Sequence, residues 1–112
     1  MAYNEQLLAR IRPLVTDQPE IEEKRMFGGM GYFVNGHYAC GSGPELIVRV
    51  GPERYMEALA NPHTDVCAPA GRPMKGWVTV DSEGYESDAD LAEWVRLGIT
   101  FAGTLPPKEQ KT

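Results

Sequence analysis

Apolar residues recur at helical spacing in two stretches of the chain, one near each end. The first stretch follows Asn4, a residue that favours a helix N-cap, and we expect a helix that is regular to Arg12. Pro13 should kink or end it, because proline lacks a backbone donor. The second stretch follows Ser87, which suits an N-cap, and it stops at Pro106.

Between these helices, short runs of apolar and β-branched residues predict an antiparallel sheet. The runs at 21–27, 31–35, 37–41 and 45–50 indicate three or four consecutive strands. Asn35-Gly36 is the strongest hairpin signal in the chain, because a type I′ turn needs positive φ at both central positions.

A short helix and two further strands are expected in the second half of the chain. A short helix is expected to open at Gly51-Pro52-Glu53, followed by a weak strand around Val66 and a firm one at 76–80. The pattern predicts an α+β fold, a two-layer α/β sandwich whose antiparallel sheet carries helices on one face. We expect a single domain over 1–107 and a disordered tail at 108–112.

The strand pattern also leaves large apolar side chains on the face that the helices would not cover. Phe33, Ile47 and Trp77 alternate with the residues that face the helices. Such a face either binds a partner, which includes a second copy in a homodimer, or is covered by loops. Alternation alone does not decide between these two interpretations.

Charge and composition narrow the classes of function. Eleven basic and sixteen acidic side chains give a net charge of −5, which disfavours direct binding of nucleic acid. No apolar run approaches the ~20 residues of a membrane span, and the N-terminus lacks the features of a signal peptide, so we expect a cytoplasmic protein without a membrane partner. Cys40 and Cys67 are interpreted as small core residues.

Glycines 28, 29 and 31 stand where a phosphate cradle could be suspected. Phosphate-binding glycines lie between a parallel strand and a helix N-terminus, whereas strands flank these on both sides. We therefore expect a turn or bulge that needs positive φ.

Three other groups of residues could form a zinc site, a catalytic nucleophile or a calcium loop. His37 and Cys40 project to opposite faces of one strand, so a zinc set with His63 and Cys67 is not expected. No nucleophile elbow accompanies the cysteines or Ser42. The acids of 81–90 lack the spacing of a calcium loop and read as a solvated turn before a helix. We expect no catalytic residue, no metal and no cofactor.

Four segments carry a family resemblance. They are 24–29 and 31–36, then Leu46-Ile47-Val48-Arg49-Val50-Gly51-Pro52 and Gly71-Arg72-Pro73-Met74-Lys75-Gly76-Trp77, with Trp94 in the closing helix. Together they resemble the N-terminal domain of the TfoX/Sxy family of bacterial competence regulators.

The resemblance implies a two-layer domain in the order α-β(3)-α-β(2)-α, without enzymatic activity. Full-length members are associated with natural transformation, as co-activators beside the cyclic-AMP receptor protein. This chain ends where their helical C-terminal domain would begin, so we expect a stand-alone N-terminal domain.

These observations lead to a non-catalytic regulatory or protein-interaction module, with transcription machinery as one candidate partner. The motif Met26, Phe27, Gly28 and Gly29 is interpreted as fold-forming. The candidate contact residues are Arg25, Arg72, Lys75 and Trp77. The alternative is a small-ligand binder or cryptic enzyme that uses a cleft near Gly28–Gly31 and His37.

Overall fold

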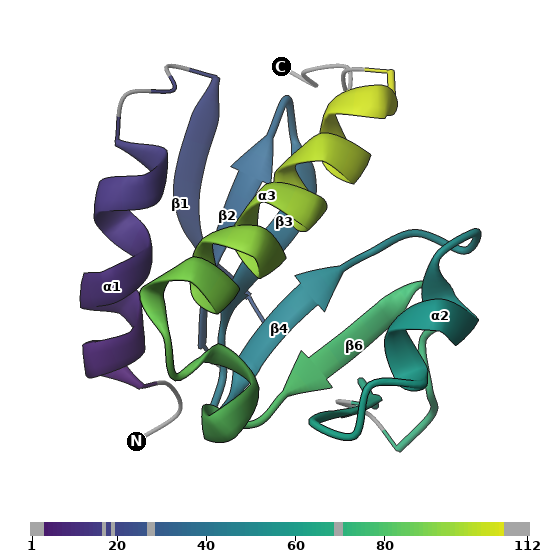
Figure 1. Ribbon diagram of the computed structural model, residues 1–112. Helices are drawn as coiled ribbons and strands as arrows, with labels where there is room; N and C mark the ends of the chain where they lie inside the picture. The colour runs from purple at the N-terminus through teal and green to yellow at the C-terminus, as the bar shows by residue number, and fades with distance from the viewer. Residues whose placement is uncertain (1–3, 17, 19, 27–28, 69–70, 107–112) are drawn as a thin grey trace.

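The computed structural model shows an antiparallel sheet with helices packed on one face (Figure 1). It describes residues 4–16, 18, 20–26, 29–68 and 71–106. The elements are α1 (Glu5–Val15), β1 (Ile21–Met26), β2 (Gly29–Val34), β3 (His37–Ser42), β4 (Leu46–Arg49), α2 (Tyr55–Leu59), β5 (Thr64–Val66), β6 (Trp77–Val80), the 3₁₀ helix η1 (Ser82–Tyr85) and α3 (Asp88–Thr104).

Within the described residues the sheet has six strands in the order β1-β2-β3-β4-β6-β5, and every neighbouring pair is antiparallel. This confirms the predicted α+β class. Four strands precede α2, in agreement with the four runs read from the sequence. The order implied by the resemblance has three strands there, one too few, because β1 to β4 all pair in a continuous meander. The predicted tail at 108–112 lies outside the described residues.

Three local signals act as the sequence predicts. Asn35 and Gly36 have φ of 52° and 89°, so both central positions of the β2–β3 turn are left-handed. The Asn4 side chain accepts the N–H of Leu7 at the start of α1, and the Ser87 hydroxyl accepts that of Asp90 at the start of α3. Each of these interactions lies within four residues of chain.

Pro13 was expected to kink or end the first helix, and the helix does not end there. It continues through Pro13 to Val15, which is buried in the core. Proline removes one backbone donor here, but only the final two residues of the helix follow it. Burial of Val15 on the same stripe as Ile11 favours the added turn.

The main core lies between the helices and the sheet. Residues of α1 and α3 pack there on the inward positions of β2, β3, β4 and β6. Gly98 of α3 lies directly on β3, since a Cβ added at this position would be 2.3 Å from the carbonyl oxygen of Ala39. Within the described residues, none of the helices combines the length and the apolar composition needed to cross a bilayer.

A second, smaller cluster covers the opposite face of the sheet. Its buried members are Phe33, Tyr38, Ile47 and Cys67, and Met74 and Trp77 pack against them. The segment before β6 therefore folds over this face, which settles the alternative that the sequence left open for Phe33 and Ile47. Both cysteines are free and buried, as expected of core residues, and burial raises the pKa of Cys40 to about 12.

Glu23 ties α1 to the sheet. Its carboxylate accepts hydrogen bonds from Arg12 of α1 at 3.1 and 3.2 Å and from the hydroxyl of Tyr32 at 3.2 Å. The bonds from Arg12 lower the pKa of Glu23, and the charge of Arg12 and the Tyr32 hydroxyl act in the same direction. A carboxylate with a lowered pKa in the folded state stabilises the fold above its unfolded pKa.

This contribution is therefore expected to disappear as the pH falls through the folded pKa of Glu23. Replacing Glu23 with glutamine should lower the melting temperature by a few degrees near neutral pH, in the range of an exposed ion pair. The difference from wild type should shrink between about pH 5 and about pH 3. Thermal melts across this range measure it, with Glu20→Gln as the control. A difference that does not change with pH would contradict the assignment.

Candidate functional site

The structure does not bring the four predicted contact residues together. Arg25 lies on the outer strand β1 and pairs with Met30, whose side chain faces the helices. Trp77 opens β6, and its ring packs on the opposite face. Three strands lie between β1 and β6, which places Arg25 and Trp77 roughly 19 Å apart. Arg25 therefore belongs to a different surface.

Arg72, Lys75 and Trp77 do share one segment. Arg72 and Lys75 are exposed in the stretch that leads into β6. Between them, the N–H of Met74 donates to the carbonyl of Cys67 at 2.9 Å, which folds the stretch back on itself. The Trp77 ring, half-buried, packs against Tyr38 with ring centres 4.8 Å apart. Two exposed cations thus belong to a segment that ends at an anchored aromatic ring.

A third cation, Arg49, lies on the neighbouring strand β4, and the sequence did not predict its position beside Trp77. It lies directly opposite Trp77 in the β4–β6 ladder. Its guanidinium carbon is 5.1 Å from the ring centre of Trp77 and 5.4 Å from that of Phe101 in α3. Burial lowers the pKa of Arg49. The alternation of strand 45–50 already placed Arg49 on the face of Ile47, and only the pairing with β6 was unknown.

Ion pairing distinguishes these cations from most other basic side chains. Within the described ranges, Arg10, Arg12, Lys24, Arg54 and Arg96 each have a carboxylate within 4 Å. The described basic side chains without such a partner are Arg25, Arg49, Arg72 and Lys75. One of these four, Arg49, lies opposite Trp77, and two more, Arg72 and Lys75, belong to the segment that leads into it. We call Arg49, Arg72, Lys75 and Trp77 the basic surface.

A groove of about 680 Å³ lies beside the basic surface, between α3 and residues 50–54. Phe101 connects the two, since it lines the groove and stacks on Arg49. The residues that line the groove include neither histidine nor cysteine. Two of its charged groups, Glu93 and Arg96, pair with each other at 2.6 Å. The groove therefore offers apolar area and a charged rim, and no thiol–imidazole pair.

One described member of the glycine motif, Gly29, has a packing role. Gly29 lies so close to β3 that a Cβ would be 2.0 Å from the carbonyl oxygen of Ser42. Met26 ends β1 and is partly exposed. Phe27 and Gly28 lie outside the described residues. The expected positive φ is wrong for Gly29 and Gly31, because both lie in strand β2 without a left-handed backbone.

The residues of the alternative ligand cleft do not converge either. The face above Gly31 is filled by the ring of Tyr38, which a Cβ at Gly31 would meet at 2.4 Å. His37 pairs with Val34 at the far end of β2, roughly 17 Å along the strand from Gly29. The His37 ring contacts the carbonyl of Pro106 instead.

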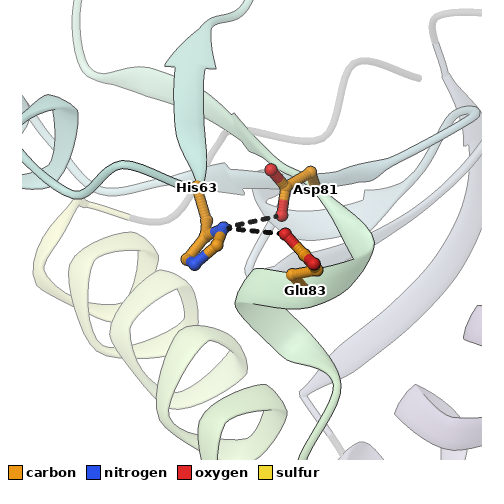
Figure 2. Close-up of side chains that lie close together, drawn as sticks. All are labelled: His63, Asp81 and Glu83. Carbon is orange, nitrogen blue, oxygen red and sulfur yellow. Dashed lines mark ion pairs between the residues drawn. The ribbon is translucent and has the colours of Figure 1, made fainter.

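A cluster that the sequence reasoning did not assemble lies where β5, β6 and η1 meet. Figure 2 shows His63, Asp81 and Glu83 with their side chains directed toward one another. The Nδ1 atom of His63 is 3.2 Å from Asp81 Oδ1 and 3.8 Å from Glu83 Oε1. Asp81 and Glu83 were interpreted as part of a solvated turn. The β5–β6 pairing, which sets Thr64 opposite Val80, is what brings His63 to them.

The four residues of the zinc set considered earlier lie apart. Cys40 is buried in the core between the sheet and the helices, whereas Cys67 is buried in the cluster on the other face. The sheet separates the two thiols. Among the described residues, the group able to hold a metal ion is His63 with Asp81 and Glu83.

Comparison with known families agrees with the resemblance seen in the sequence. A family model described as the TfoX N-terminal domain matches residues 13–102, well over half of the chain. The match begins inside α1 and ends inside α3, so it covers the whole sheet. No curated protein matches the chain.

Proposed function

We propose, since this chain belongs to the TfoX N-terminal domain family, that it acts as a non-catalytic module that binds a partner protein in a regulatory role. The family supports a TfoX-like module. The regulatory role, the protein partner and the absence of catalysis are the proposal, and a component of the transcription machinery is the candidate partner.

The observation that carries the proposal is the basic surface. A chain with a net charge of −5 has carboxylates available for its cations, yet Arg49, Arg72 and Lys75 have no acidic partner among the described residues. Arg49 contacts the half-buried Trp77, and Arg72 and Lys75 lie in the exposed segment that leads into it. Arginine and tryptophan are the residues that dominate interface energetics. Stacking of Arg49 between Trp77 and Phe101 fixes one cation in place.

The chemistry of this surface favours an acidic segment of a partner protein. Carboxylates of the partner would pair with the three cations that have no acidic partner among the described residues. Its apolar side chains would pack on Trp77 and in the adjoining groove. A phosphate backbone is disfavoured, because three cations on an acidic chain release few counterions from nucleic acid. Cytoplasmic action is part of the same proposal.

Reversing two of these charges should weaken binding of an acidic peptide without unfolding the protein. We expect the double variant Arg72→Glu/Lys75→Glu to bind a fluorescein-labelled deca-glutamate peptide at least about tenfold more weakly, because each reversal replaces attraction with repulsion. Fluorescence anisotropy at low ionic strength measures the affinity. The melting temperature should stay close to that of wild type, since both side chains are exposed.

The matched control changes the same net charge elsewhere. Lys24→Glu/Arg25→Glu alters two cations of β1, far from Trp77, and should keep most of the peptide affinity. Equal losses in both double variants would show a general charge effect and would overturn the assignment. Affinity capture from the native host with each variant then identifies the partner. The native mass of the purified protein shows whether it forms a homodimer. Retention of duplex DNA at physiological ionic strength tests direct binding of nucleic acid.

A further inference from the structure

Three metal-binding groups of two chemical kinds converge outside the basic surface. The ligand atoms of His63, Asp81 and Glu83 all lie within 4.8 Å of one another, and they come from two segments that the sheet brings together (Figure 2). We propose that this cluster binds a divalent transition-metal ion, with Zn²⁺ as the reference ion.

The fold holds two of the three ligands in place. The N–H of Asp81 donates to the carbonyl of His63 at 2.9 Å, and the Asp81 carboxylate accepts the N–H of Gly84 at 3.0 Å. The Cβ of His63 lies against Gly84, where an added Cβ would approach it to 2.7 Å. Because backbone and packing fix His63 and Asp81, an ion would have to order only the side chain of Glu83.

The spacing of these atoms suits a small divalent ion. Zinc binds nitrogen and oxygen ligands at roughly 2.0–2.2 Å, which sets tetrahedral ligand atoms roughly 3.3 Å apart. Nδ1 of His63 is 3.2 and 3.8 Å from the two carboxylate oxygens. A shift of about half an ångström in Glu83, whose side chain is 78% exposed, would bring its oxygen to this distance from Nδ1, and the three ligand atoms already lie within 4.8 Å of one another.

The imidazole decides which class of ion fits. Acidic residues alone are common on surfaces and would suit Ca²⁺ or Mg²⁺, which prefer oxygen ligands. A histidine nitrogen among two carboxylates selects for Zn²⁺, Co²⁺ or Ni²⁺ over these hard ions. With three protein ligands, the remaining coordination position faces solvent and is open to water.

Calorimetric titration of the whole chain with ZnCl₂ tests the proposal. We expect one Zn²⁺ per chain, bound at least about tenfold more tightly than Mg²⁺ in a parallel titration. The absorption spectrum of the Co²⁺-loaded protein gives an independent readout, because its intensity reports the coordination geometry. Binding of Mg²⁺ as tight as that of Zn²⁺ would overturn the proposed role of the imidazole.

The variants use the two histidines of the chain as a matched pair. His63→Ala should abolish the binding of Zn²⁺, whereas His37→Ala should leave the Zn²⁺ affinity unchanged. Glu83→Gln should keep the fold, since among the described residues this side chain interacts with His63 alone, and it should weaken binding at least about tenfold. Glu86→Gln is the carboxylate control. Equal Zn²⁺ affinity in wild type and His63→Ala, or a loss confined to His37→Ala, would refute the site.

Discussion

Replacing Gly98 with alanine is expected to lower the free energy of unfolding by about 3 kcal/mol, the upper end of overpacking costs. An added Cβ would stand 2.3 Å from the carbonyl oxygen and 2.9 Å from the carbonyl carbon of Ala39. These are backbone atoms of β3, so the collision cannot be relieved by turning a side chain. The helix must move away from the sheet and loosen the contacts of Val95 and Ala102. Urea unfolding measures the loss.

Gly103 provides the matched control, because it lies in the same helix and an added Cβ would meet no described atom within 4 Å apart from its chain neighbours and the backbone of its own helix. Gly103→Ala should be neutral or stabilise the fold by up to about 1 kcal/mol, since alanine favours helix. The pair separates helix propensity from the close approach. If both variants unfold at the same urea concentration, the contact between α3 and β3 is not as tight as described.

Truncating Ile11 to alanine is expected to remove about 2–5 kcal/mol of stability. Ile11 is 0% exposed and packs between α1 and the sheet. Alanine favours helix at least as well as isoleucine, so the loss comes from the cavity and the lost apolar burial. For a domain whose whole stability is about 5–15 kcal/mol, this is a large fraction. Urea unfolding with an unchanged m-value would report it.

Met56→Ala is the control for this truncation. Met56 lies in α2 with 73% of its surface exposed, so the same loss of side-chain atoms should change stability by less than about 0.5 kcal/mol. A comparable loss in both variants would mean that the region around α1 is not the main core.

The sequence predicts best where the cause is local. Asn35-Gly36 specifies its own turn, and Asn4 and Ser87 cap helices through bonds to residues three positions away. Each depends on neighbours that are visible in the sequence. The strand runs were readable for the same reason, since alternation needs only a few consecutive residues.

The errors arose where distant packing overrides local preference. Pro13 was expected to kink or end α1, but the helix continues to Val15, which is buried in the core. Gly29 and Gly31 read as left-handed turn residues, yet each is needed for its lack of a side chain beside β3 and Tyr38. A glycine can serve either purpose, and the sequence alone does not distinguish them.

Only part of the candidate site could be predicted from the sequence, for a related reason. Arg72, Lys75 and Trp77 adjoin one another in the chain, so their grouping was visible. The positions of Arg25 and Arg49 relative to Trp77 depend on the order of strands in the sheet. That order places Arg25 far from Trp77 and Arg49 directly opposite it. His63 likewise meets Asp81 and Glu83 only through the β5–β6 register. Strand order and register are long-range properties that alternation cannot supply.

The two borders of the sheet are unequal, and both resist growth into larger assemblies. β1 exposes a long backbone edge, but four consecutive charged residues, Glu22 to Arg25, occupy it on both faces. A strand arriving from another molecule would have to strip water from these charges. β5 offers only three residues for pairing. Fibril-like stacking through backbone bonds is thereby discouraged, and crowded solutions of the folded chain should remain clear.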